Sequence, residues 1–284
     1  MTQQFINEIG INEIGFYIPN NFISNEEQIP KFGLDELFLD QKIGTRKLSR
    51  KSTEQDTSDL CVKALEELEK RVKIKREMID CLVVVTQNPD GDGLPHTSAI
   101  VHAKLNLSTN CAAFDISLGC SGYVYALSII KSFMESNKLK NGLLFTCDPY
   151  SKIINIDDKN TSMLFGDAAT VTLMNDNPKL ILDKFIFATS GIEADSLICK
   201  HGVLTMNGRA VFNFCGTEVP KQIRQLINDY NNGLEADIEK KIEGAHNLIN
   251  SENDILWIFK NSSIELISNK LDFNENYSPL IPVN

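Results

Sequence analysis

The sequence lacks the features that mark membrane and secreted proteins. No apolar run approaches the roughly 18 residues from which a membrane-spanning helix is recognised. Residues 1–10 contain neither a basic segment nor a long apolar one, so we expect no secretory signal peptide. With 42% hydrophobic and 23% charged residues, the composition is that of a folded, soluble protein. We therefore expect a cytoplasmic protein that does not bind a membrane.

Patterns for disulfides and metals are also missing. The chain has 7 cysteines, an odd number, and none of them forms a Cys-x-x-Cys pair. Its 4 histidines show neither His-x-x-x-His nor His-Glu-x-x-His spacing. Scattered cysteines of this kind are typical of a reducing cytoplasm. We therefore expect no disulfide framework, no metal site and no bound cofactor.

Positive charge is in short supply: 28 basic residues face 38 acidic ones, for a net charge of -10. A general binder of nucleic acid needs a positive surface, so we expect no nucleic-acid partner. One local exception is the basic run at residues 42–51, with Lys42, Arg46, Lys47, Arg50 and Lys51. Two interpretations are open for it, a solvated loop and a lip that faces the phosphates of a ligand.

What the sequence does contain is a layered α/β pattern. Residues 79–86 and 142–147 are apolar runs of strand length, which suits strands buried on both faces of a sheet. Residues 57–71 repeat apolar side chains at helical spacing, after a cap at Thr57-Ser58-Asp59. Strands that alternate with helices predict an α/β fold with stacked layers.

A second part of the chain is expected after the polar turn that ends at Pro178. We predict two domains, residues 1–175 and 176–284. In the second, residues 180–190 are strand-like, residues 219–230 are helical, and residues 254–259 read as a buried strand.

One cysteine stands where a strand pattern gives way to a helical pattern. Residues 114–118 are rich in apolar side chains, Cys120 follows between small residues, and a helical pattern runs from Tyr123 to about Ser136. Small neighbours allow a ligand to approach, and a helix N-terminus favours a thiolate. Cys120 is therefore a candidate nucleophile. The alternative is a small buried core residue, which is what most free cysteines are.

Several motifs in order resemble those of the β-ketoacyl-acyl-carrier-protein synthase III family, whose members have the thiolase fold. The resemblance covers most of the first 215 residues. It is carried by residues 42–46 (KIGTR), 57–60 (TSDL), 114–127 around Cys120, 164–169 (LFGDAA) and 206–212 (MNGRAVF). It implies a layered αβαβα fold of two related halves, of which the second is incomplete here. It also implies a dimer.

The resemblance implies acyl transfer from acyl-coenzyme A or from acyl-acyl carrier protein to Cys120, followed by condensation with malonyl-acyl carrier protein. Backbone N–H groups, including that of Cys120, would hold the oxyanion. Phe38 would stack on the adenine, and Phe212 would line the acyl pocket. Lys42 and Lys159 stand where the family usually has arginine; lysine keeps the charge but loses the two-pronged hydrogen bonding.

The sequence departs from the family pattern near its end. Lys260 stands where the family has a catalytic histidine, Ser263 replaces an asparagine, and no Gly-Asn-Thr-Ser loop follows. A desolvated lysine can carry a proton or stabilise an enolate, but Lys260 is equally interpreted as a surface residue after a strand. Three hypotheses are open: a shortened enzyme that has lost condensation, a divergent acyltransferase, and a non-catalytic partner of an intact homologue.

Overall fold

The computed structural model describes residues 8–231 of the chain. Of the described residues, 8–212 belong to one compact unit and 213–231 to a second. The predicted strand at 254–259 and Lys260 lie outside the described residues. The predicted domain boundary at 175/176 stays a prediction.

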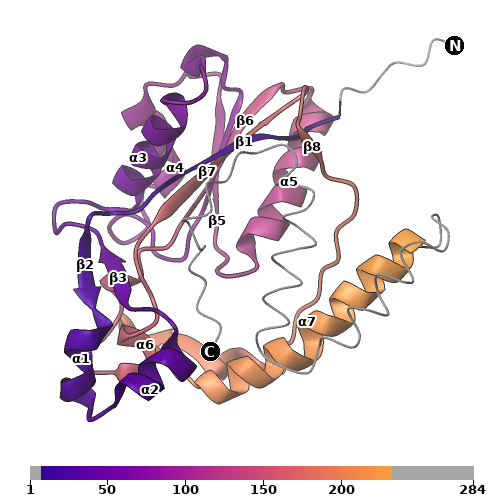
Figure 1. The fold of residues 1–284 in the computed structure, drawn as a ribbon. Coiled ribbons are helices and arrows are strands. Elements are labelled where there is room, and N and C mark those ends of the chain that lie inside the picture. The colour runs from indigo at the N-terminus through magenta and orange to yellow at the C-terminus, as the bar shows by residue number, and fades with distance from the viewer. Residues whose placement is uncertain (1–7, 232–284) are drawn as a thin grey trace, which may run out of the picture. The chain divides into compact units, whose positions relative to one another are not determined.

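A six-stranded mixed sheet organises the larger unit (Figure 1). Its strands are β1 (Gly10–Tyr17), β4 (Cys81–Val85), β5 (Ala112–Ile116), β6 (Asn141–Cys147), β7 (Ala169–Asn175) and β8 (Leu180–Ile181). They lie in the order β5-β4-β6-β7-β1-β8. β4 pairs parallel with β5 and β6, and the pairs that involve β7 or β8 are antiparallel. Every residue of β4 is buried, which confirms the strand predicted from its apolar run.

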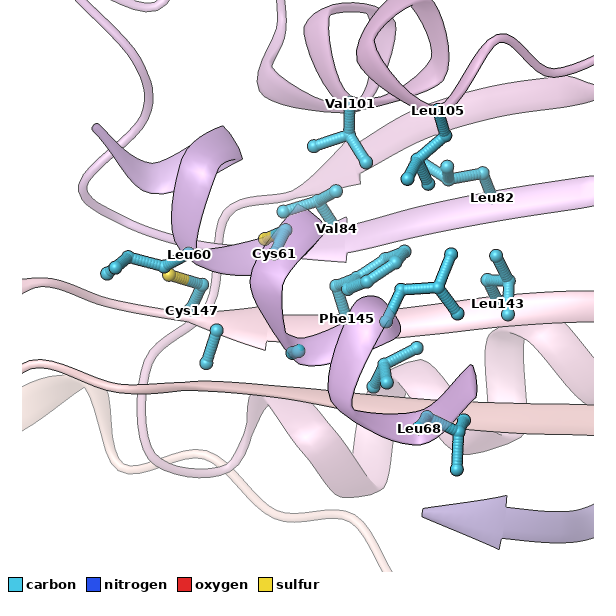
Figure 2. Close-up of a cluster of buried hydrophobic side chains, with 14 of the residues drawn as sticks. Leu60, Cys61, Leu68, Leu82, Val84, Val101, Leu105, Leu143, Phe145 and Cys147 are labelled. Atoms are coloured by element: carbon cyan, nitrogen blue, oxygen red, sulfur yellow. The ribbon is translucent and has the colours of Figure 1, made fainter. Parts of the chain in front are cut away.

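Helices cover both faces of this sheet (Figure 1). α3 (Thr57–Glu69) and α4 (Thr97–Leu105) pack on one face, and α5 (Gly122–Asn137) packs on the other. Figure 2 shows the core under α3 and α4, where Phe145 of β6 lies among Leu82, Val84 and Leu143. Side chains of β4 and of the middle of β6 alternate between the two cores, which explains why β4 is apolar at every position and β6 is apolar from Leu143 to Phe145.

Two short hairpins and the remaining helices complete the described chain. β2 (Asn21–Ser24) and β3 (Lys47–Arg50) pair antiparallel, as do β9 (Leu197–Lys200) and β10 (Val203–Met206). The other helices are α1 (Asn25–Phe32), α2 (Glu36–Phe38), the π-helical turn η1 (Leu39–Ile43), the 3-10 turns η2 (Arg76–Met78), η3 (Tyr150–Lys152) and η4 (Gly191–Ser196), α6 (Lys159–Ser162) and α7 (Gly208–Asn231). Between residues 8 and 231, none of the helices combines the length and the apolarity that crossing a bilayer requires.

Two sequence interpretations of local structure are wrong. Part of the basic run 42–51 is not a solvated loop, because residues 47–50 form β3 and Leu48 is buried. The predicted strand at 180–190 shrinks to Leu180–Ile181, since β1 pairs with these two residues alone at that edge. In both cases the deciding contact comes from a strand distant in sequence.

Two helix starts also differ from prediction. α3 is capped by Asp56, whose carboxylate accepts from the Thr57 N–H at 2.8 Å, while Asp59 accepts from the Asp56 N–H at 2.9 Å. This reciprocal pair is a capping box, shifted one residue from the predicted cap. The helix predicted at 219–230 is confirmed, but it begins earlier, at Gly208.

Candidate active site

Cys120 lies in the short loop between β5 and α5. β5 ends at Ile116 and α5 begins at Gly122, so the loop places Cys120 immediately before the first helical turn. Its side chain is exposed. Cys120 is therefore not a core residue, and a ligand can reach its sulfur from solvent.

The other cysteines differ from Cys120 in burial or position. Cys61 and Cys147 are buried, and burial raises the pKa of Cys147 well above its ordinary value. Burial likewise raises the pKa of Cys81 to about 12 and that of Cys111 to about 11. Thiols that stay protonated are poor nucleophiles, so Cys81, Cys111 and Cys147 fit a structural role. Cys61 fits one because it is fully buried.

The backbone around Cys120 offers an unpaired donor. No described residue accepts a hydrogen bond from the Cys120 N–H, although the Gly122 N–H closes a turn onto the Gly119 carbonyl at 2.8 Å. Cys120 precedes Ser121, the N-cap of α5, so its N–H lies outside the hydrogen bonding of the helix. A free N–H next to a nucleophilic sulfur is what an oxyanion site needs.

Gly122 lets α5 start close against β4. A Cβ added at Gly122 would lie 2.5 Å from Val85 Cγ1, which is closer than real contacts allow, and 3.0 Å from Leu118 Cβ, which is a tight contact. At Gly119 a Cβ would meet the flexible end of Gln87 instead, at 2.6 Å. The close packing of α5 on β4 therefore requires glycine at position 122.

Gly122→Ala should lower the free energy of unfolding by about 1–3 kcal/mol, because the added methyl group overpacks the contact with Val85. Chemical denaturation of the full chain measures this loss. Gly119→Ala is the matched control and should cost less, since the Gln87 side chain can rotate away. Equal stability of Gly122→Ala and the unmodified chain would contradict the close contact.

Two residues that no motif marked lie beside Gly119. The Tyr150 hydroxyl lies 3.9 Å, and Gln87 Oε1 2.6 Å, from the position that a Cβ of Gly119 would take. The Tyr150 ring stacks on Phe165, with 4.5 Å between ring centroids. Sequence reasoning missed Tyr150 because residues 148–161 form an irregular polar stretch without a recognisable pattern.

Asp148 holds the loop that carries Gln87. Its Oδ1 accepts from the Gln87 N–H at 2.7 Å, from Thr86 Oγ1 at 3.1 Å, and from the Asn88 N–H and side-chain amide, both at 3.1 Å. Burial raises the pKa of Asp148, and these donors oppose that rise by stabilising the carboxylate. The carboxylate thus ties the end of β4 to the end of β6 beside Cys120.

Two of the predicted substrate-binding residues come together. Lys159, at the start of α6, places its Nζ 5.9 Å from the ring centroid of Phe38 in α2, a cation–π contact. Lys42, in η1, is exposed and has no ion-pair partner among the described residues. Arg46, in contrast, pairs with Glu26 and Asp40. Lys42 is therefore available to an anionic ligand, whereas Arg46 is already paired with carboxylates.

The remaining predicted residues are less informative. Phe212, on α7, is half-buried. Lys260 lies outside the described residues.

The segment that contains Cys120, and most of the chain around it, resembles known proteins. A family model for 3-oxoacyl-[acyl-carrier-protein (ACP)] synthase III matches residues 114–191, which include Cys120. The chain is 31% identical to the β-ketoacyl-[acyl-carrier-protein] synthase III of Streptococcus mutans, over 80% of this chain and 73% of that one. It is 32% identical to the protein of the same name from Aliarcobacter butzleri, over 84% of this chain and 72% of the other.

The fold agrees with these relatives. A crystal structure of a 3-oxoacyl-(acyl-carrier-protein) synthase III superimposes with a TM-score of 0.73 and 27% identity, covering 79% of this chain and 74% of that chain. The fold is therefore the thiolase-like α/β fold, as the motifs predicted. Sequence identity and fold agree over the part of the chain that contains Cys120. The chain belongs to the β-ketoacyl-[acyl-carrier-protein] synthase III family.

Proposed function

We propose that this chain is an acyltransferase of the 3-oxoacyl-acyl-carrier-protein synthase III type, acting in fatty-acid or related acyl-chain biosynthesis. It takes an acyl group from acyl-coenzyme A or acyl-acyl carrier protein. The Cys120 sulfur bonds to the thioester carbon, the bond from that carbon to the donor sulfur breaks, and the donor leaves as a thiolate that is protonated by water. The observation that carries this proposal is the exposed Cys120 thiol at the start of α5.

The unpaired N–H of Cys120 supports the same role. As the thioester carbon becomes tetrahedral, its oxygen gains negative charge, and this N–H together with a second donor holds it.

Donor binding is proposed at the exposed edge formed by α2, η1 and α6. Phe38 stacks on the adenine of coenzyme A, and Lys42 and Lys159 attract its phosphates. The contact between Lys159 and Phe38 supports a shared role, because it brings an aromatic face and a cation to one place. Phe212 lines the acyl pocket. Acyl carrier protein is the proposed protein partner.

Incubation with acetyl-coenzyme A and then with malonyl-acyl carrier protein tests the proposal. We expect release of free coenzyme A, up to one equivalent per chain, in the first step. In the second step a β-ketoacyl product would show that Lys260 or another group performs the work of the family histidine. No release of coenzyme A from any acyl donor tried would contradict the acyltransferase proposal.

A second candidate function is that of a non-catalytic partner of an intact homologue. Lys260 in the place of the family histidine favours it. This hypothesis predicts a stable complex with the homologue and no release of coenzyme A by the chain alone. Co-purification of the two proteins measures the complex.

Dimer formation, with a second copy or with a homologue, is also proposed. β5 is the edge strand of the described sheet, and an edge strand leaves N–H and carbonyl groups that can pair with another chain. We also propose that the protein is cytoplasmic. We propose that its two domains are residues 1–175 and 176–284.

A further inference from the structure

The hydroxyl of Tyr150 is a polar group that the proposed acyl transfer does not use. The ring is half-buried and stacks on Phe165 at an interplanar angle of 26°. Among the described residues the hydroxyl has no hydrogen-bond partner. The hydroxyl is not among the buried atoms that lack a partner, so it stays accessible and can donate to a ligand or to a reacting atom.

The backbone of Tyr150 is fixed by the two residues that follow it in η3. The Ser151 N–H donates to Oδ1 of the fully buried Asp167 at 3.0 Å. Lys152 Nζ pairs with Asp56 Oδ1 at 2.6 Å. Together with the stack on Phe165, these bonds hold the Tyr150 ring in one orientation.

That orientation directs the hydroxyl to the nucleophile loop. It lies 3.9 Å from the Cβ position of Gly119, the residue next to Cys120. Burial raises the pKa of Tyr150, and the negative charges of Asp148 and of a Cys120 thiolate raise it further. The phenol therefore keeps its proton when the thiol loses its own, and a neutral phenol is a hydrogen-bond donor.

The other charged groups around the site are already bonded. Asp148 accepts from the loop that carries Gln87. Asp115, at the end of β5, accepts from the N–H groups of Thr97 and Ser98, and the nearby His96 Nδ1 lies 3.9 Å from it. Lys152 is paired with Asp56, as described above.

The structure shows no hydrogen bond between Tyr150 and Cys120, but the exposed Cys120 side chain can turn toward the phenol. We propose that the Tyr150 hydroxyl then donates a hydrogen bond to the sulfur of Cys120 and stabilises its thiolate, which makes Tyr150 a catalytic residue of the acylation step. The catalytic role of Tyr150 rests on the proposed function, whereas the hydrogen bond itself does not. No proton moves in this step: the O–H bond of Tyr150 stays intact while the sulfur attacks the acyl carbon.

Tyr150→Phe tests the proposal, because it keeps the ring and its stack and removes the hydroxyl alone. The measurement is the rate of alkylation of Cys120 by iodoacetamide against pH, followed by peptide mass spectrometry. Loss of a donor to the anion disfavours the thiolate, so the midpoint should move up by roughly one pH unit, with about tenfold slower alkylation below it. Cys199, an exposed cysteine on β9, is the internal reference and should not change. Identical Cys120 profiles would overturn the hydrogen bond.

A second variant tests the same hydrogen bond in case Tyr150→Phe does not fold. Phe165→Leu keeps the hydroxyl but removes the ring that holds it, and it should shift the Cys120 profile in the same direction by less. No shift in a folded variant overturns the hydrogen bond.

Alkylation requires no acyl donor, so the two proposals fail separately. A shifted profile in a protein that accepts no acyl group would overturn the proposed function and support the hydrogen bond. An unshifted profile in a protein that accepts acyl groups would overturn the hydrogen bond alone.

Discussion

Cys120→Ala should abolish the release of free coenzyme A from acyl-coenzyme A in a single-turnover assay. The reason is chemical: alanine has no group that can form a bond to the acyl carbon, so the first half of the reaction has no acceptor. The buried thiols cannot replace it, because burial keeps groups such as Cys81 and Cys147 protonated and out of reach.

Cys199→Ala is the matched control for this loss. Cys199 is exposed like Cys120, but it lies on β9 and not at the start of a helix. Its replacement should leave the rate of coenzyme A release unchanged. If Cys120→Ala released coenzyme A at the original rate, another group would be the nucleophile.

Phe145→Ala should lower the free energy of unfolding by about 3–5 kcal/mol, which is the usual cost of deleting a buried phenylalanine side chain. Phe145 is fully buried on β6, beneath α3, and its ring contacts β4 side chains on the neighbouring strand (Figure 2). Alanine would leave a cavity between the sheet and α3, and the surrounding side chains would fill it only in part. Urea denaturation of the full chain measures the change.

Phe22→Ala is the control for Phe145→Ala. Phe22 lies on β2 with 54% of its surface exposed and a cation–π contact to Lys47, so its loss should cost about 1 kcal/mol or less. Equal destabilisation by the two variants would contradict the core described here. β6 also leads directly into Asp148 and Tyr150, so its anchoring in the core bears on the site as well.

The parts of the fold that were predictable are those with a strong local pattern. β4 and β6 follow from apolar runs, and α5 follows from the helical repeat after Cys120. β3 was not predictable, because its basic sequence reads as a loop and its pairing with β2 is a contact between distant residues. The short extent of β8 has the same cause, since β1 decides where pairing stops.

The candidate site likewise contains residues that the sequence indicates and residues that only the folded structure brings together. The position of Cys120 between a strand and a helix could be predicted from the local pattern. The substrate-binding roles of Phe38 and Lys159, which the family resemblance implies, stay predictions. Asp148 and Tyr150 could not be predicted, because their roles depend on hydrogen bonds and stacking that only the folded chain creates. Nothing in the residues around Tyr150 indicates that its hydroxyl approaches Gly119.

The most direct test of the central claim is to locate the acyl group after reaction with acyl-coenzyme A. The reaction is quenched in acid, the chain is digested, and the peptides are sequenced by mass spectrometry. We expect one acyl group, bound as a thioester to the sulfur of Cys120. An acyl group on Cys199 or on a lysine, or no acyl group at all, would contradict it.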